Sequence, residues 1–340
     1  MDYTLIIPTF NRPSLLAALL VHLRRSSAVF PIIVLDSSAE EAKQQNAIAI
    51  ADSGLVVSHR LFPQNTTVQQ KFAQGFHLAT TRYASLCADD DVLFIEGLRD
   101  CVAKLEADPI VAICDGVYLN FNPKPDHIAL QIEYDGPSAD QDSPLVRMSR
   151  RLDRYEATTY AVFRTEVARK VFDGCAEIPS SLFWELFTSL APLGIGKHIR
   201  LPSTYLGRRG GSPSESLKRW HPLLWMKDDP EELFVHFSRY LKLLAAFVSI
   251  HGNSAVTWQR IAFLHPTYFR KECPDFRLKG LDDPLLAAPP LTISEKVWDR
   301  MAYYWHNRNK GGFRGRSDLL ARIPARTQRE LREYCASIST

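Results

Sequence analysis

The feature that most constrains the fold is a regular alternation of short apolar segments and amphipathic segments over roughly the first 120 residues. The apolar runs lie at residues 4–7, 32–35, 55–57, 83–87 and 111–114. Segments with apolar side chains at helical spacing lie between them, at residues 14–23, 68–81 and 96–106. Short strands that are apolar at every residue are typical of parallel sheets buried on both faces. The sequence therefore predicts an α/β fold with a mixed, mainly parallel sheet flanked by helices.

The pattern loosens beyond residue 120. Residues 121–145 are rich in Pro, Asp and Gly, which predicts a long loop. A short strand is expected at 160–163 and a short helix at 165–172. From residue 230 onward the spacing predicts helices, at residues 231–250, 294–305 and 327–337. We therefore expect a catalytic domain over residues 1–225 and a mainly helical extension over residues 226–340.

The composition is that of an ordinary globular protein, with 46% hydrophobic and 23% charged residues. A formal net charge of +3 is too small to indicate a nucleic-acid partner. No apolar run approaches the roughly 18 residues that span a bilayer, and the N-terminus lacks the basic start of a signal peptide. The six cysteines form no CxxC pair, so we expect buried thiols. These observations predict a soluble, cytoplasmic protein.

Polar segments follow three of the predicted strands, where ligands bind in open parallel sheets. They are Pro8-Thr9-Phe10-Asn11-Arg12, Asp36-Ser37-Ser38 and Asp89-Asp90-Asp91. The usual glycine-rich dinucleotide and P-loop motifs do not occur, so a bound phosphate needs another partner. Three adjacent carboxylates repel a phosphate, but a divalent cation between them turns the same groups into a diphosphate site. The alternative is that Asp89–Asp91 forms a solvated turn or a helix cap.

The segments 5–12 (LIIPTFNR), 34–38 (VLDSS) and 83–91 (YASLCADDD) together resemble the family 2-like glycosyltransferases of the GT-A fold. The resemblance covers residues 3–120 well and extends more weakly to about residue 220. It implies an enzyme that moves a hexosyl or N-acetylhexosaminyl group from a nucleotide-diphospho-sugar. It also implies a divalent metal, Mn²⁺ or Mg²⁺, and transfer with inversion.

The resemblance also implies roles for single residues. The first motif (Pro8, Thr9, Phe10, Asn11 and Arg12) would line the nucleotide site, and Asp36 would accept the N3–H of a uracil. Asp91 is the expected direct metal ligand. Asp89 would face the ribose, the metal or its waters, with Asp90 beside it in the donor site. The alternative for Asp36 is helix capping.

Two departures from the family pattern stand out. Ala88 occupies a position where an aspartate is common, so the acidic motif could be shifted by one residue. An expected arginine position holds Phe72, and Lys71 precedes it. Lys71 is a candidate for the missing positive charge, although neighbouring side chains on a helix point about 100° apart.

A single-displacement transfer needs a carboxylate that takes a proton from the acceptor hydroxyl. The resemblance places this base near Glu185, where burial among aromatic side chains would raise the pKa of a carboxyl. Trp184 could give a sugar a stacking face. The alternatives are a solvent-facing Glu185, with Asp173 or Glu177 as the base.

The basic segment that begins at Arg208 and Arg209 precedes Gly210 and Gly211 and is a candidate to close over a diphosphate. His198 is either an additional metal ligand or a surface residue. At the C-terminal end, basic and aromatic residues gather over 303–316. They are interpreted as a solvated face, a homodimer contact or a contact with anionic lipid at the inner membrane face.

The sequence therefore predicts a metal-dependent, inverting glycosyltransferase that acts from a nucleotide-diphospho-sugar, most simply a uridine-linked one. The acceptor would be a hydroxyl of a glycan, of a lipid-linked molecule or of a protein. Two alternatives stay open: a nucleotidyltransferase of a related fold, and a non-catalytic module that binds a sugar nucleotide.

Overall fold

The structure is a computed structural model that describes residues 1–124, 127–210, 225, 229–252, 255–266, 268–269 and 323–338. The first part of the chain alternates strands and helices. In order they are β1 (Tyr3–Thr9), α1 (Pro13–Arg25), β2 (Ile32–Asp36), α2 (Glu40–Ser53), β3 (Val57–Leu61), α3 (Val68–Leu78), β4 (Tyr83–Leu86), β5 (Val92–Leu93) and α4 (Ile95–Ala107). The later elements are β6 (Val111–Pro123), β7 (Ile128–Tyr134), α5 (Pro144–Asp153), β8 (Val162–Arg164), α6 (Thr165–Gly174), α7 (Ser181–Ile195), β9 (Lys197–Arg209), α10 (Pro230–His251), α11 (Trp258–Ala262) and α15 (Ala325–Ile338).

Local sequence accounts for several helix ends. Pro13 occupies the first position of α1, where its missing N–H is not needed. Thr67 and Gln70 form a capping box at the start of α3. At the end of α2, Gly54 adopts a left-handed conformation with φ of 66°.

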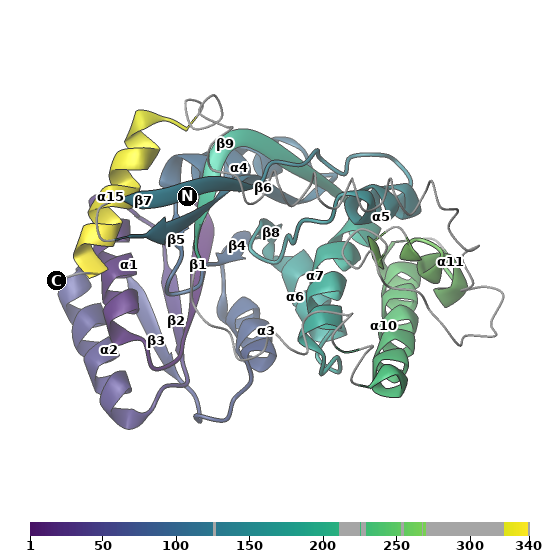
Figure 1. Ribbon diagram of the computed structural model, residues 1–340, viewed down its shortest axis with the longest axis horizontal. Helices are drawn as coiled ribbons and strands as arrows, with labels where there is room; N and C mark the ends of the chain where they lie inside the picture. The colour runs from purple at the N-terminus through teal and green to yellow at the C-terminus, as the bar shows by residue number, and fades with distance from the viewer. Residues whose placement is uncertain are drawn as a thin grey trace.

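One mixed sheet forms the centre of the molecule, with strand order β3-β2-β1-β4-β8-β6-β9-β5 and β7 paired to β6. Strands β3, β2, β1 and β4 run parallel to one another, whereas β8 is antiparallel to both β4 and β6. Helices lie against the sheet, and the predicted mixed α/β fold is confirmed (Figure 1). The parallel strands bring the loops after β1, β2 and β4 to one edge of the sheet.

The predicted loop at 121–145 is wrong. Strand β6 continues to Pro123, β7 pairs with it antiparallel, and α5 begins at Pro144. All seven residues of β7 are half-buried, so the segment has no alternation by which it could be recognised. Strand β9 was not anticipated, and β3 begins at Val57, two residues later than the apolar run at 55–57.

The elements beyond residue 225 pack at two ends of the molecule. Helix α10 lies beside α7 at one end, with α11 against α10, and α15 lies against α1 at the other end (Figure 1). Helix α10 is long and apolar enough to cross a membrane by length and composition, but its inner face packs in the same buried cluster as α7. The division at residue 225 stays a prediction. The expected helix at 294–305 and the basic segment at 303–316 lie outside the described residues.

Candidate active site

The loops after β1 and β4 are held together by ionic and hydroxyl contacts. The Thr9 hydroxyl donates a hydrogen bond of 2.7 Å to Asp89 Oδ2. The Arg12 guanidinium lies 2.6 Å from Asp89 Oδ1 and 2.7 Å from Asp90 Oδ2. The first motif and the acidic motif therefore form one site, as the sequence predicts from their positions at strand ends.

The turn after β1 is held in an unusual backbone conformation. Asn11 has φ of 54°, a left-handed region that non-glycine residues seldom adopt. Its N–H donates to Ser38 Oγ at 2.8 Å, and its side-chain oxygen accepts from the Ala39 N–H at 2.8 Å. These bonds tie the β1 loop to the β2 loop. Pro8 is buried in β1, and the neighbouring Phe10 is 45% exposed, as a side chain available to a ligand would be.

Lys71 points into this site. Its ammonium group donates to the Thr9 carbonyl at 3.0 Å and to Ser37 Oγ at 2.9 Å. Burial lowers the pKa of Lys71, while the charges of Asp89 and Asp36 oppose that effect. Phe72, at the expected arginine position, is buried in the core instead. Because neighbouring side chains on a helix point about 100° apart, α3 directs Lys71 to the site and Phe72 to the core.

Asp36 is fully buried and holds three donors. Its Oδ1 accepts from the Ser38 N–H at 2.8 Å, and its Oδ2 accepts from Asn46 at 2.8 Å and lies 3.0 Å from His59 Nε2. Burial acts to raise the pKa of Asp36, but the bonds from His59, Ser38 and Asn46 hold it well below its usual range. Its contact with a uracil stays a prediction. No local sequence pattern indicates the roles of Asn46 and His59, which lie 10 and 23 residues away.

The acidic motif concentrates negative charge in a buried place. Burial is the main cause that raises the pKa of Asp89 to about 6 and of Asp91 to about 7, and the neighbouring charge of Asp90 adds to both. The Arg209 N–H donates to Asp91 Oδ1 at 3.1 Å. Carboxylates whose ionised form is disfavoured gain from a bound cation.

The donor set fits a divalent metal only in part. Throughout the described ranges, no three His, Cys, Asp or Glu side chains are arranged to hold a metal. Hard oxygen ligands from one or two aspartates suit Mg²⁺ or Mn²⁺ when a diphosphate supplies further oxygens. That Asp91 and Asp89 hold such an ion together with a nucleotide stays a prediction.

Glu185 lies on the first turns of α7 and is half-buried. The Tyr155 hydroxyl donates to its Oε1 at 3.0 Å. The Arg208 guanidinium donates to the Tyr134 hydroxyl at 3.2 Å. Burial acts to lower the pKa of Arg208, but Tyr134, Asp91, Tyr160 and Glu185 raise it above its ordinary value. The solvent-facing alternative for Glu185 does not describe this arrangement.

The two alternative bases lie in exposed ion pairs. Asp173 pairs with His77 at 2.8 Å, and its side chain is 53% exposed. Glu177 pairs with Arg239 at 2.9 Å, and its side chain is 72% exposed. Neither environment offers the burial that a general base uses, so Glu185 remains the candidate.

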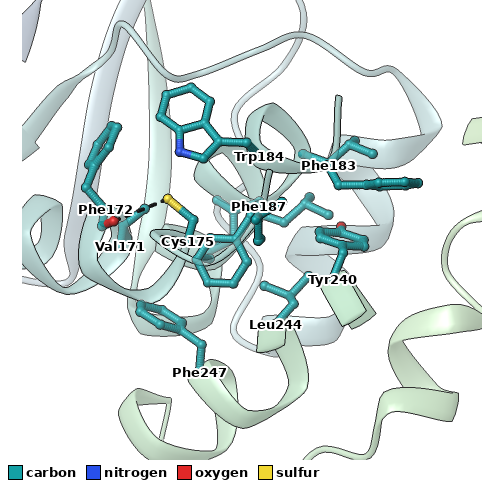
Figure 2. Packing of buried hydrophobic residues seen from close by; sticks show 14 of the residues in the cluster. Val171, Phe172, Cys175, Phe183, Trp184, Phe187, Tyr240, Leu244 and Phe247 are labelled. Carbon is teal, nitrogen blue, oxygen red and sulfur yellow. Dashed lines mark hydrogen bonds between the residues drawn. The ribbon is translucent and has the colours of Figure 1, made fainter. Parts of the chain in front are cut away.

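Trp184 does not offer a face to a sugar. It is 6% exposed and packs with Phe72 and Phe172, at ring-centroid distances of 5.6 and 5.7 Å. Figure 2 shows it among the buried aromatic side chains of α6, α7 and α10. Helix α7 therefore points Trp184 into the core, whereas the next residue, Glu185, is half-buried and accepts a hydrogen bond from Tyr155.

His198 is neither a surface residue nor a metal ligand in this structure. It is fully buried, with Nε2 2.9 Å from Asp115 and Nδ1 2.5 Å from Arg151. Both ring nitrogens therefore have protein partners. The expectation of buried thiols is confirmed for the five cysteines within the described ranges, and Cys273 lies outside them.

The fold is a mixed α/β sheet with a polar site at the ends of its parallel strands, and sequence comparison gives the family. Residues 4–172 match the model of Glycosyl transferase family 2. The chain belongs to this family and is a glycosyltransferase with a GT-A fold. No curated protein matches the chain.

Two solved structures illustrate the likeness. The crystal structure of S. aureus TarS 1–349 is 12% identical, with a TM-score of 0.45 over 91% of this chain and 92% of that chain. The mannosyltransferase PcManGT from Pyrobaculum calidifontis, in complex with GDP-Man and Mn²⁺, is 12% identical, with a TM-score of 0.47 over 99% of this chain and 86% of that chain. Because both TM-scores are below 0.5, we transfer no residue role from either.

Proposed function

We propose that this glycosyltransferase moves a sugar from a nucleotide-diphospho-sugar, most simply a uridine-linked one, to an acceptor hydroxyl with inversion, in the presence of a divalent metal. The observation that supports this most is the contact between the two motifs: the Thr9 hydroxyl donates to Asp89, and the Arg12 guanidinium pairs with Asp89 and Asp90. The loop that would bind the nucleotide and the motif that would hold the metal thus lie side by side.

Different side chains would bind the donor, balance its charge and take the proton of the acceptor. The loop of Thr9, Asn11 and Arg12 would hold the nucleotide, and Lys71, Arg208 and Arg209 would balance the diphosphate. Glu185 would take the proton of the acceptor hydroxyl as its oxygen attacks the anomeric carbon and the bond to the diphosphate breaks. A metal held by Asp91, with Asp89 near it, would neutralise the charge that develops on the leaving nucleoside diphosphate.

Binding can be tested by thermal denaturation with UDP, UDP-glucose, UDP-N-acetylglucosamine and GDP-mannose, each with and without Mn²⁺. A ligand at 100 times its Kd should stabilise the protein by about 2.7 kcal/mol. We expect stabilisation by at least one uridine nucleotide that needs Mn²⁺. Asp91→Asn should abolish the metal-dependent part and leave the fold intact, since the change is isosteric.

Asp100→Asn is the matched control, because Asp100 is an exposed residue of α4 and should bind as the wild type does. Equal metal-dependent stabilisation in Asp91→Asn and in the wild type would remove Asp91 from the metal site. The same loss in Asp90→Asn alone would show that the acidic motif is shifted by one residue. Binding of sugar nucleotides without release of nucleoside diphosphate on incubation would support the non-catalytic module instead.

A further inference from the structure

Tyr155 is a residue of the site that the sequence did not single out. It lies in the segment between α5 and β8, and its ring packs against that of Tyr268 at a centroid distance of 5.0 Å. Its hydroxyl lies 3.0 Å from Glu185 Oε1 and 3.4 Å from Ser189 Oγ. Glu185 and Ser189 are four residues apart on α7, so they lie on the same face of that helix.

The hydrogen bonds around Tyr155 run in one direction. The Thr158 N–H can only donate, and Ser189 Oγ accepts from it at 3.2 Å. An ionised carboxylate can only accept, so the single hydroxyl proton of Tyr155 goes to Glu185. The contact between Tyr155 and Ser189 must then be donated by the serine. The Glu185 carboxylate therefore fixes the direction of a chain that runs from the Thr158 amide through Ser189 and Tyr155.

Tyr155 keeps its proton over the whole working range of pH. Burial raises the pKa of Tyr155 well above its ordinary value, and the charge of Glu185 raises it further. Its ring packs edge to face against that of Tyr268, which limits the freedom of the hydroxyl to turn away. The donor to Glu185 is therefore both permanent and oriented.

We propose that Tyr155 is the positioning residue for the general base: its hydroxyl, aligned by Ser189 and the Thr158 amide, orients the Glu185 carboxylate and keeps it ionised. This inference rests on the proposed function of Glu185. A hydrogen bond to the charged form of a carboxyl favours that form, so the loss of this bond makes Glu185 easier to protonate.

The test is Tyr155→Phe, which removes one oxygen and keeps the ring. Two readouts apply: the pH titration of the Glu185 carboxyl by ¹³C NMR, assigned by its loss in Glu185→Gln, and the pH profile of nucleoside diphosphate release from UDP-N-acetylglucosamine, UDP-glucose and GDP-mannose. We expect the titration midpoint and the acid limb of kcat/KM to move up by about one pH unit. We also expect kcat to fall about tenfold while KM for the donor stays within about twofold.

Tyr118→Phe is the matched control. Tyr118 is fully buried, and its hydroxyl has no hydrogen-bond partner among the described residues, so its removal should move neither readout. A Glu185 midpoint in Tyr155→Phe equal to that of the wild type would overturn the inference, as would reduced activity with an unmoved acid limb.

The same experiment distinguishes a failure of the proposed role of Glu185 from a failure of the proposed role of Tyr155. Full activity in Glu185→Gln would remove Glu185 as the base, and the proposed role of Tyr155 in the reaction would fall with it. An inactive Glu185→Gln together with an unshifted Tyr155→Phe would overturn the role of Tyr155 alone. A shifted midpoint in Tyr155→Phe would support the hydrogen bond through the NMR titration even where a given donor is not turned over.

Discussion

Asp36 shows how one residue can hold a binding site together. The carboxylate lies at the end of β2 and joins Ser38 in the following loop, Asn46 on α2 and His59 on β3. Each of these partners loses a hydrogen bond if the carboxylate is removed. Because all of them are at least half-buried, water compensates poorly for the loss.

At the residue scale we predict that Asp36→Ala lowers the unfolding free energy by about 3 kcal/mol, since it leaves several buried donors without an acceptor. Urea denaturation monitored by tryptophan fluorescence measures this value. Asp52→Ala, at an exposed position of α2, is the control and should change stability by less than about 0.5 kcal/mol. A near-neutral Asp36→Ala that loses uridine binding selectively would instead favour direct contact with the base.

At the scale of elements, α15 connects the end of the chain to the strands that carry the site. Leu331 is 1% exposed, and a Cβ added to Gly207 of β9 would lie 3.4 Å from its Cδ2. Gly207 is paired with Val92 of β5, the residue after Asp91. Helix α15 therefore packs behind the acidic motif, and its removal should loosen the strands that position Asp91 and Arg209.

We predict that Leu331→Ala costs about 2–4 kcal/mol, because it opens a cavity between α15 and the sheet. It should also weaken Mn²⁺-dependent nucleotide binding more than a change on the outer face of the helix does. Arg332→Ala, at the exposed next residue, is the control for both measurements. If the two variants have the same denaturation midpoint, α15 does not support the sheet.

At the scale of the whole molecule, buried histidines and buried aspartates change the free energy of unfolding in opposite directions as pH falls. Burial lowers the pKa of His198 and of His265 to about 4, so between about pH 6.5 and 4 the unfolded chain binds more protons at these residues than the folded chain does. The histidines therefore make the protein less stable as pH falls. Asp89 and Asp91, whose pKa values are raised, act with the opposite sign over roughly pH 4 to 7.

We predict that His265→Gln removes part of the acid sensitivity. The difference in unfolding free energy between pH 7.5 and pH 5, measured by urea denaturation, should move by up to about 2 kcal/mol towards greater stability at pH 5 relative to the wild type. Because the variant and the wild type both contain Asp89 and Asp91, the difference between them reports the contribution of His265. His77→Gln, at an exposed residue, is the control, and an identical shift in both variants would contradict the prediction.

The sequence by itself determined the α/β class, the positions of β1, β2 and β4, and the edge of the sheet where the site lies. These features depend on local signals: apolar runs, helical spacing, Pro13 at a helix start, and polar residues directly after buried strands. Local patterns suffice here because strands buried on both faces are apolar throughout and parallel strands end at a common edge.

The tertiary structure alone decided how the site is completed. Strands β7 and β9 carry no clear alternation, so only their pairing with β6 shows them to be strands. Lys71 points to the site from the helix predicted at 68–81, and Trp184 of α7 points into the core. Tyr155 meets Glu185 across 30 residues of chain. Spacing cannot reveal such contacts, because they arise from packing between elements that are distant in sequence.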